Sequence, residues 1–348
     1  MRLGQAFDPR HNALNLWRLI LATGVIFWHS FPLTGNTIDF QPAVRLLSEV
    51  WVDGFFTVSG FLITASWMRR PHLGEYWRAR FLRIFPGLWV CVAVTAFVIA
   101  PIAAAVKHSS LPLSAEFAYV VNNGLLNVFY AGINGTPKDI PWPGVWNGSL
   151  WTLVFELLCY IAVCVLGLLG LLKRQWVLPT LFVASAVWSA YVSYPTMAQQ
   201  TIPQMLARFA VVFLAGALIH QYRDAIPARW SLVALCGVIV VASGFAQNYR
   251  LIAALPLGYA IIVSGALVRR FPLRNDISYG MYIYAFPVQQ LLATLGLVSL
   301  HPTVFFLVAA LCTIPLAAAS WFVVEKRAMA LKHPKRQQVA VGTSSHLK

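Results

Sequence analysis

The sequence contains few charged residues. Asp, Glu, Lys and Arg together make up 11% of its 348 residues, whereas soluble domains usually contain about 25%. So few charges cannot cover the surface of a soluble protein of this length, and a typical soluble globular fold is therefore excluded. Acidic residues are the scarcest, with 11 against 26 Lys and Arg, so the formal net charge is +15.

Cysteine is also scarce, and its spacing matches neither a metal site nor a disulfide framework. The five cysteines each lie in apolar stretches, where a free cysteine behaves as a small core residue. The eight histidines show no metal-ligand spacing either. We therefore expect no bound metal and no disulfide scaffold.

Long apolar runs fill most of the chain, since 59% of the residues are hydrophobic. A helix needs about 20 mostly apolar residues to cross a bilayer. The sequence predicts an all-α polytopic integral membrane protein with about ten transmembrane helices. The predicted spans are 12–33, 50–68, 84–106, 149–172, 176–194, 203–221, 230–246, 251–268, 276–299 and 302–324.

These spans make up one membrane domain, 1–325, followed by a basic cytoplasmic tail, 326–348, that can touch anionic lipid. The segment 107–148 is the one long loop. It is expected to be extracytoplasmic, with Trp142 and Trp146 as anchors at the membrane interface.

The positions of Lys and Arg predict the orientation. With the N-terminus in the cytoplasm, twenty of these residues fall in cytoplasmic segments, four fall on the opposite side and two lie inside spans. This asymmetry follows the positive-inside rule. It predicts a bacterial inner-membrane protein with both termini in the cytoplasm. Because the basic residues are spread over six segments, we expect no nucleic-acid partner.

Ionisable residues inside the spans are the first candidates for function, because burying charge in a bilayer is costly. Arg18 and His29 are eleven residues apart in the first span, which places them on one helix face about 16 Å apart along the axis. A snorkelling arginine and an interfacial histidine would also explain the pair. His29, Asp53, Glu156 and Arg208 are expected at similar depths on the extracytoplasmic side, around a polar cavity.

Six segments resemble, in order and spacing, the signatures of the acyltransferase 3 family of integral membrane proteins. They read RLILATGVIFWH, VDGFFTVSGFLIT, YWRARFLRIFPGLW, GSLWTLVFELLCY, RFAVVFLAGALIH and SYGMYIYAFPVQQ, and the last span ends in VVEK. The resemblance extends over nearly the whole chain. It implies ten core helices and transfer of an acyl group, mostly acetyl from acetyl-CoA, to a hydroxyl of a surface sugar.

The resemblance also implies roles for particular residues. His29, Arg18, Glu156 and Ser59 are the catalytic candidates. Arg78, Arg80 and Arg83, which precede the third span, are candidates for binding the phosphates of acetyl-CoA or another acyl-CoA. Apart from the resemblance, Asp53, Arg208 and Trp151 are candidates for binding a glycan or glycolipid acceptor. Many relatives carry a histidine where this chain has Ala285, so a mechanism that needs a second histidine there is not expected.

The chemistry of these residues leaves several alternatives open. His29 can accept the proton of the acceptor hydroxyl, or it can carry the acyl group briefly as an acyl-imidazole. Arg78, Arg80 and Arg83 also fit the positive-inside rule alone, and Ser59 with Gly60 also fits close helix packing. A transporter or flippase of a glycolipid or small metabolite would likewise require intramembrane charges.

Overall fold

A computed structural model describes residues 1–127, 130–192, 201–268, 273 and 275–332. The described residues form helices and no β-sheet, with two isolated bridges, Arg2 to Pro227 and Ile133 to Thr136. The α-helices are α1 (Leu3–Ala6), α2 (Leu14–Leu33), α3 (Gln41–Leu47), α4 (Val50–Arg69), α5 (Leu73–Val94), α6 (Ala100–Val106), α7 (Leu113–Gly124), α8 (Thr152–Leu168), α9 (Val177–Tyr191), α10 (Ile202–Gln221), α11 (Trp230–Ser243), α12 (Arg250–Leu267), α13 (Ser278–Thr294), α14 (Pro302–Ala319) and α15 (Lys326–Ala330). Short π- or 3-10-helical segments are η1 (Thr95–Ile99), η2 (Leu171–Lys173), η4 (Leu297–Ser299) and η5 (Ser320–Glu325).

Each of the ten predicted spans is a helix. Within the described residues, six helices are long and apolar enough to cross a membrane, and α8, α9 and α11 are shorter apolar helices. The protein is therefore an all-α polytopic membrane protein, as the sequence predicts. α14, η5 and α15 continue as one helix from Pro302 to Ala330, so the predicted domain boundary at 325 falls inside a helix. Most of the predicted tail, 333–348, lies outside the described residues.

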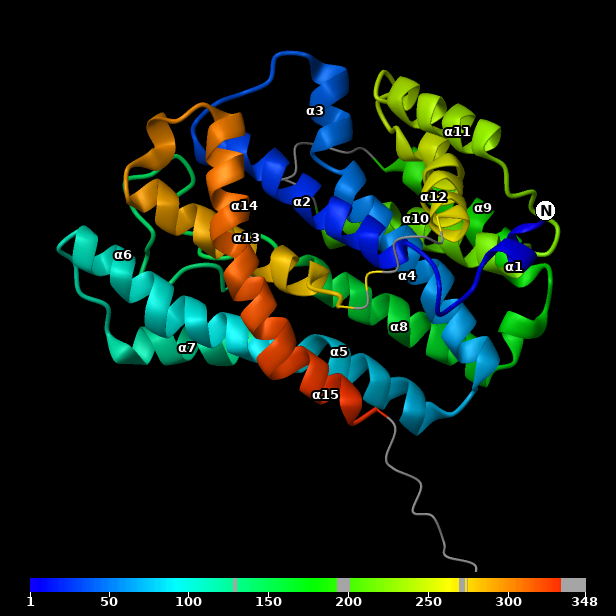
Figure 1. The fold of residues 1–348 in the computed structure, drawn as a ribbon, viewed down its shortest axis with the longest axis horizontal. Coiled ribbons are helices and arrows are strands. Elements are labelled where there is room, and N and C mark those ends of the chain that lie inside the picture. Colours follow the sequence, from blue (N-terminus) through cyan, green and yellow to red (C-terminus); the bar gives the residue numbers. More distant parts are fainter. Residues whose placement is uncertain (128–129, 193–200, 269–272, 274, 333–348) are drawn as a thin grey trace, which may run out of the picture.

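α13 lies at the centre of the bundle (Figure 1), and nearly all of its residues are buried. α2, α5 and α14 pack around it. α4 packs very closely against α10, because Gly60 and Gly216 leave no side chain between the two backbones. A Cβ atom at Gly60 would lie 1.9 Å from the carbonyl oxygen of Phe213, and one at Gly216 would lie 2.0 Å from that of Thr57. Small residues at such contacts are typical of membrane helices.

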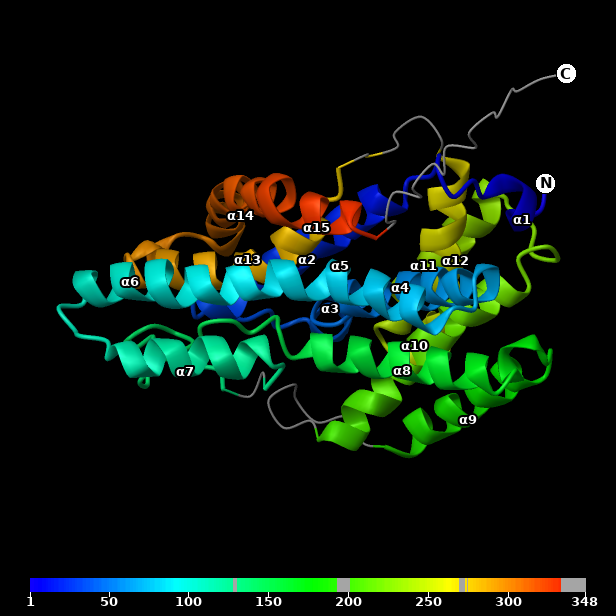
Figure 2. The ribbon, with the colours of Figure 1, turned by 90° about the horizontal axis from the view of Figure 1, so that it is seen from below.

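The third predicted span is longer than expected. α5, η1 and α6 form one helix of 34 residues that begins at Leu73 rather than at 84, which corresponds to a length of about 50 Å. Figure 2 shows this helix crossing the whole molecule. The sequence prediction began late because the first turns are rich in arginine. Arg78, Arg80 and Arg83 consequently lie on a helix and not in a loop.

The prediction that 107–148 is one long loop is wrong, because the segment contains the 12-residue helix α7. α7 packs along α5 and η1, and Figure 2 shows α7 and α8 in line beside the long helix. Trp146 is 1% exposed, and its indole N–H donates to Thr136 Oγ1 at 3.0 Å. Asn147 donates to the carbonyl oxygen of Ile283, inside α13, at 2.8 Å. Irregular backbone can lie at membrane depth when protein surrounds it in this way.

Candidate active site

A cavity of about 670 Å³ runs along one face of α4. Its lining includes Arg69 at one end of α4 and Val52 near the other, a separation of about 25 Å along the helix axis. Residues of α2, α5, α8 and α13 complete the wall. The cavity is therefore an elongated channel, suited to an extended ligand rather than a compact one.

The mouth of the cavity carries an excess of positive charge. Arg10, Arg69, Arg80 and Lys332 all line it. Burial lowers the pKa of Lys332, and the neighbouring charges of Arg80 and Arg69 lower it further. Positive charge gathered in this way favours an anionic ligand. We call this end of the bundle the basic end.

Arg80 lacks partners for two of its guanidinium nitrogens. Nε and Nη2 are buried and have no hydrogen-bond partner among the described residues. The guanidinium lies over the rings of Tyr76 and Tyr160, 5.0 and 5.6 Å from their centroids. A buried guanidinium without an anion is costly. Arg80 is thus the side chain in this cavity best suited to bind an anionic ligand.

Arg18 and Arg83 share one carboxylate. Asp276, in the segment before α13, lies 3.2 Å from Arg18 Nη1 and 2.7 Å from Arg83 Nη2. Arg83 also lies 3.8 Å from Glu325, at the end of η5. These contacts hold α2, α5 and α13 together at the basic end and fix both guanidiniums on the cavity wall. Sequence analysis missed Asp276, although it comes two residues after Arg274, at the end of an arginine-rich segment.

Glu156 lies in the middle of the cavity, away from His29 and Asp53. α8 begins at Thr152, whose hydroxyl lies 2.7 Å from that of Tyr282 inside α13. Glu156 follows one turn later and accepts hydrogen bonds from Tyr160 and, at 3.4 Å, from Ser59. The expectation that Glu156 shares the level of His29 is therefore wrong, because α8 starts halfway along the bundle.

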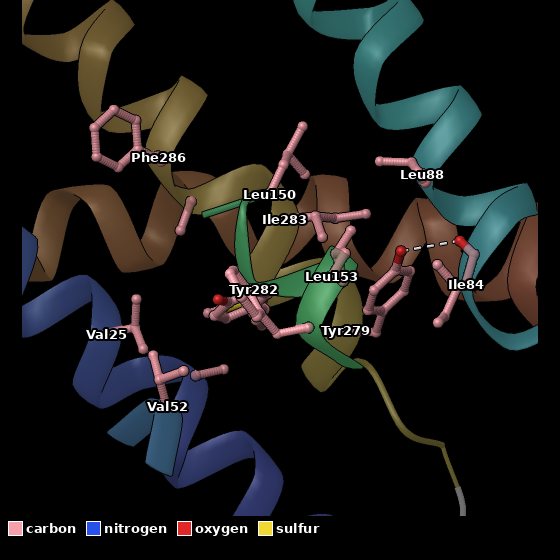
Figure 3. Packing of buried hydrophobic residues seen from close by; sticks show 14 of the residues in the cluster. Val25, Val52, Ile84, Leu88, Leu150, Leu153, Tyr279, Tyr282, Ile283 and Phe286 are labelled. Atoms are coloured by element: carbon pink, nitrogen blue, oxygen red, sulfur yellow. Dashed lines mark hydrogen bonds between the residues drawn. The ribbon is translucent and has the colours of Figure 1, made fainter. Parts of the chain in front are cut away.

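His29 does not line this cavity. It is part-buried on α2, where its ring contacts those of Phe286 and Trp142 at centroid distances of 5.0 and 6.2 Å. Gln290 of α13 holds the loop over this spot by donating to the carbonyl oxygens of Trp142 and Val145. Figure 3 shows Phe286 on α13, beyond Tyr282, which lines the inner end of the cavity. Phe286 thus packs against His29 and, like His29, does not line the cavity.

Asp53 and Arg208 belong to a closed ion cluster. Asp53 is fully buried and binds Arg208 at 3.1 Å, Arg250 at 2.6 Å and the hydroxyl of Tyr249. Glu49 pairs with both arginines. Trp151 packs on the outside of this cluster, with the Arg208 guanidinium 5.9 Å above its ring. None of these residues lines the 670 Å³ cavity.

Arg78 projects from another face of α5 than Arg80, because a two-residue step turns a helix by about 200°. It lines a groove of about 330 Å³ together with Trp77, Phe81 and Leu157, and Arg80 borders this groove as well as the large cavity. Of the three arginines expected to bind one ligand, Arg80 and Arg83 therefore line the large cavity and Arg78 does not.

The fold and the cavity define a polytopic membrane protein with a channel that is lined by basic residues at one end. His29 lies on α2, which also contributes to the wall of this channel. A family model described as an acyltransferase domain matches residues 11–322, and the chain belongs to this family of membrane acyltransferases. An O-acetyl transferase of Shigella phage Sf6 is 28% identical over 94% of this chain and 98% of its own length. Nodulation protein 10 of Rhizobium leguminosarum bv. viciae is 26% identical over 92% and 94%. No solved structure matches the chain.

Proposed function

We propose that this membrane acyltransferase moves an acyl group, most simply acetyl from acetyl-CoA, to a hydroxyl of a cell-surface or lipid-linked glycan. In this proposal the protein lies in the bacterial inner membrane with both termini in the cytoplasm, so the basic end faces the cytoplasmic donor. The relative named an O-acetyl transferase supports acetyl as the group transferred.

The observation that carries the proposal is that two guanidinium nitrogens of Arg80, in the wall of a channel about 25 Å long, have no partner among the described residues. An acyl-CoA has anionic phosphates at one end and a thioester on a long flexible arm at the other. Arg80, Arg83 and the basic residues at the mouth would bind the phosphates, while Arg18, which shares Asp276 with Arg83, would border the arm. The apolar inner end, with Val52 and Phe55, would receive the acyl group.

His29 supplies the base in this proposal. The acceptor oxygen attacks the thioester carbon, its proton passes to His29, the carbon–sulfur bond breaks, and the thiolate that leaves takes up a proton. The acceptor reaches His29 from the side of Trp142, and the Phe286 ring must turn aside for the two substrates to meet. Transfer through an acyl-imidazole on His29 would use the same geometry.

Purified protein incubated with labelled acetyl-CoA tests the proposal. We expect acyl transfer to a glycan acceptor, or slow thioester hydrolysis without one. His29→Ala should lower turnover by about 10²–10⁴-fold while binding of a non-hydrolysable acetyl-CoA analogue persists. His72→Ala, an exposed histidine at the start of α5, is the matched control and should have no effect.

A different result would favour transport. α7 and α8 lie in line but are separate helices that end and begin within the bundle (Figure 2). Interrupted helices are also a feature of transporters. If the protein released no label from acetyl-CoA but moved a glycolipid across vesicle membranes, the acyltransferase proposal would fail. Near-normal turnover by His29→Ala would instead remove His29 from the mechanism and leave the donor site in place.

A further inference from the structure

We infer that Tyr282, together with the beginning of α8, binds the carbonyl oxygen of the donor thioester and stabilises the negative charge that forms on it. This inference rests on the proposed donor. It assigns a catalytic role to a residue that neither its sequence position nor the resemblance singled out. It follows from what lies at the inner end of the cavity, farthest from the basic end.

The hydroxyl of Tyr282 is a hydrogen-bond donor held at this inner end. Tyr282 is 8% exposed and lines the cavity beside Phe55, whose ring lies 5.5 Å away. Its hydroxyl is 2.7 Å from Thr152 Oγ1, and Thr152 donates its own hydrogen to the carbonyl oxygen of Ser149 at 3.1 Å. Tyr282 must therefore be the donor in the pair. The phenol hydrogen can turn from Thr152 to a ligand oxygen.

The N-terminus of α8 lies at the same place. Thr152 is the first residue of this 17-residue helix, and no side chain caps it. The unpaired N–H groups of a first turn carry a partial positive charge. The hydroxyl of Ser149, 2% exposed, has no hydrogen-bond partner in the part of the chain that the structure describes. Thr152 and Tyr282 line the cavity, whereas Ser149 lies just behind them and does not. A polar oxygen that arrives here would thus meet the Tyr282 hydroxyl beside the positive end of α8.

Tyr282 and His29 are placed so that the acceptor hydroxyl, held by His29, can attack the thioester carbon from the side opposite Tyr282. Tyr282 precedes Phe286 by one turn of α13, about 6 Å along the axis, and the ring of Phe286 contacts that of His29. Figure 3 shows the hydroxyl end of Tyr282 on the side of Val25 and Val52, which belong to α2 and α4. A thioester carbon at the inner end of the cavity would have Tyr282 at its oxygen and, once the Phe286 ring turns aside, His29 on the side of the incoming hydroxyl.

The chemical consequence is balanced. When the acceptor oxygen bonds to the carbonyl carbon, the C=O π electrons move to the carbonyl oxygen, which accepts a hydrogen bond from Tyr282. When the carbonyl re-forms, the carbon–sulfur bond breaks and the thiolate leaves. Tyr282 transfers no proton in this scheme. Loss of one such donor typically lowers the rate constant by about 10²–10³-fold.

Tyr282→Phe tests the inference, because it keeps the ring and removes only the hydroxyl. We expect kcat for acetyl-CoA turnover to fall by about 10²–10³-fold, with analogue affinity changed less than about threefold. Tyr284→Phe is the matched control, since Tyr284 is 2% exposed on the same helix but does not line the cavity. Thr152→Val should lower kcat less, and Thr152→Ser should restore it, because serine keeps the hydroxyl that orients Tyr282.

Two outcomes would overturn the inference: a near-normal kcat in Tyr282→Phe, or an equal loss of kcat and analogue affinity, which would indicate packing. If Tyr282→Phe does not fold, the comparison of Thr152→Val with Thr152→Ser decides, since equal activity of those two contradicts the role. A different failure is recognisable from the unaltered protein. If it turns over no acetyl-CoA, the proposed function itself is wrong and the inference falls with it.

Discussion

Two groups of buried arginines in this molecule have opposite surroundings. Arg208 and Arg250 meet Asp53 and Glu49 in a cluster of two cations and two anions, closed off from the large cavity. At the other end of the bundle, two guanidinium nitrogens of Arg80 are buried with no partner in the described part of the chain. The charges of the first group balance one another, whereas the second group has positive charge available to bind a ligand. An intramembrane charge therefore indicates a ligand site only when its own protein leaves it unbalanced.

The largest expected effect lies in the closed cluster. Asp53→Asn keeps the shape of the side chain but leaves Arg208 and Arg250 short of one buried anion, which should destabilise the fold by about 3–5 kcal/mol. Thermal unfolding in detergent measures this loss. Asp39→Asn, at an exposed residue, is the control. The folded fraction should bind the acetyl-CoA analogue normally. A stable Asp53→Asn that lost donor binding would break the comparison, because the cluster would then belong to the ligand site.

The positions of the helices were predictable from sequence, but the partners of the charged residues were not. Apolar runs placed all ten predicted spans on helices, since length and hydropathy decide where a chain can cross a bilayer. Asp53 and Arg208, however, are 155 residues apart in the chain. Nothing local to either residue reveals that the two form an ion pair, and both resembled acceptor-binding residues for that reason.

The start of α8 shows a second limit of the sequence. Hydropathy suggested a full span from 149, so Glu156 was expected near its outer end. In the structure α7 and α8 share the length of the long helix, and the chain between them folds into the bundle. Only tertiary contacts, such as that of Asn147 with Ile283, place Glu156 in the cavity and Thr152 beside Tyr282. Tyr282 was missed because tyrosine is ordinary in an apolar helix.

An intermediate effect is expected from the arginines of the cavity. Arg80→Gln and Arg83→Gln each remove charge-assisted hydrogen bonds to phosphate, worth about 1.5–3 kcal/mol, so analogue affinity should fall by about 10- to 150-fold in calorimetry. Their stabilities should differ. Arg80→Gln removes a poorly paired charge and should leave the unfolding temperature nearly unchanged, whereas Arg83→Gln deprives Asp276 and Glu325 of a partner and should lower it. Unchanged affinity in both variants would mean that these arginines do not bind the donor and only follow the positive-inside rule.

The smallest effect is expected from Arg78→Gln, which sharpens the comparison within a single helix. Arg78 carries the same charge as Arg80 and lies only two residues away, so any field that merely concentrates anions at this end should depend on both about equally. The structure instead turns Arg78 into the groove beside Phe81, outside the large cavity. We therefore expect Arg78→Gln to lower analogue affinity less than about twofold, corresponding to the few tenths of a kcal/mol expected of an exposed charge. Titration at low and high salt separates the two explanations, because screening weakens a diffuse field more than a buried contact. A tenfold loss in Arg78→Gln that disappears at high salt would mean that net charge, and not the placement of Arg80, attracts the donor.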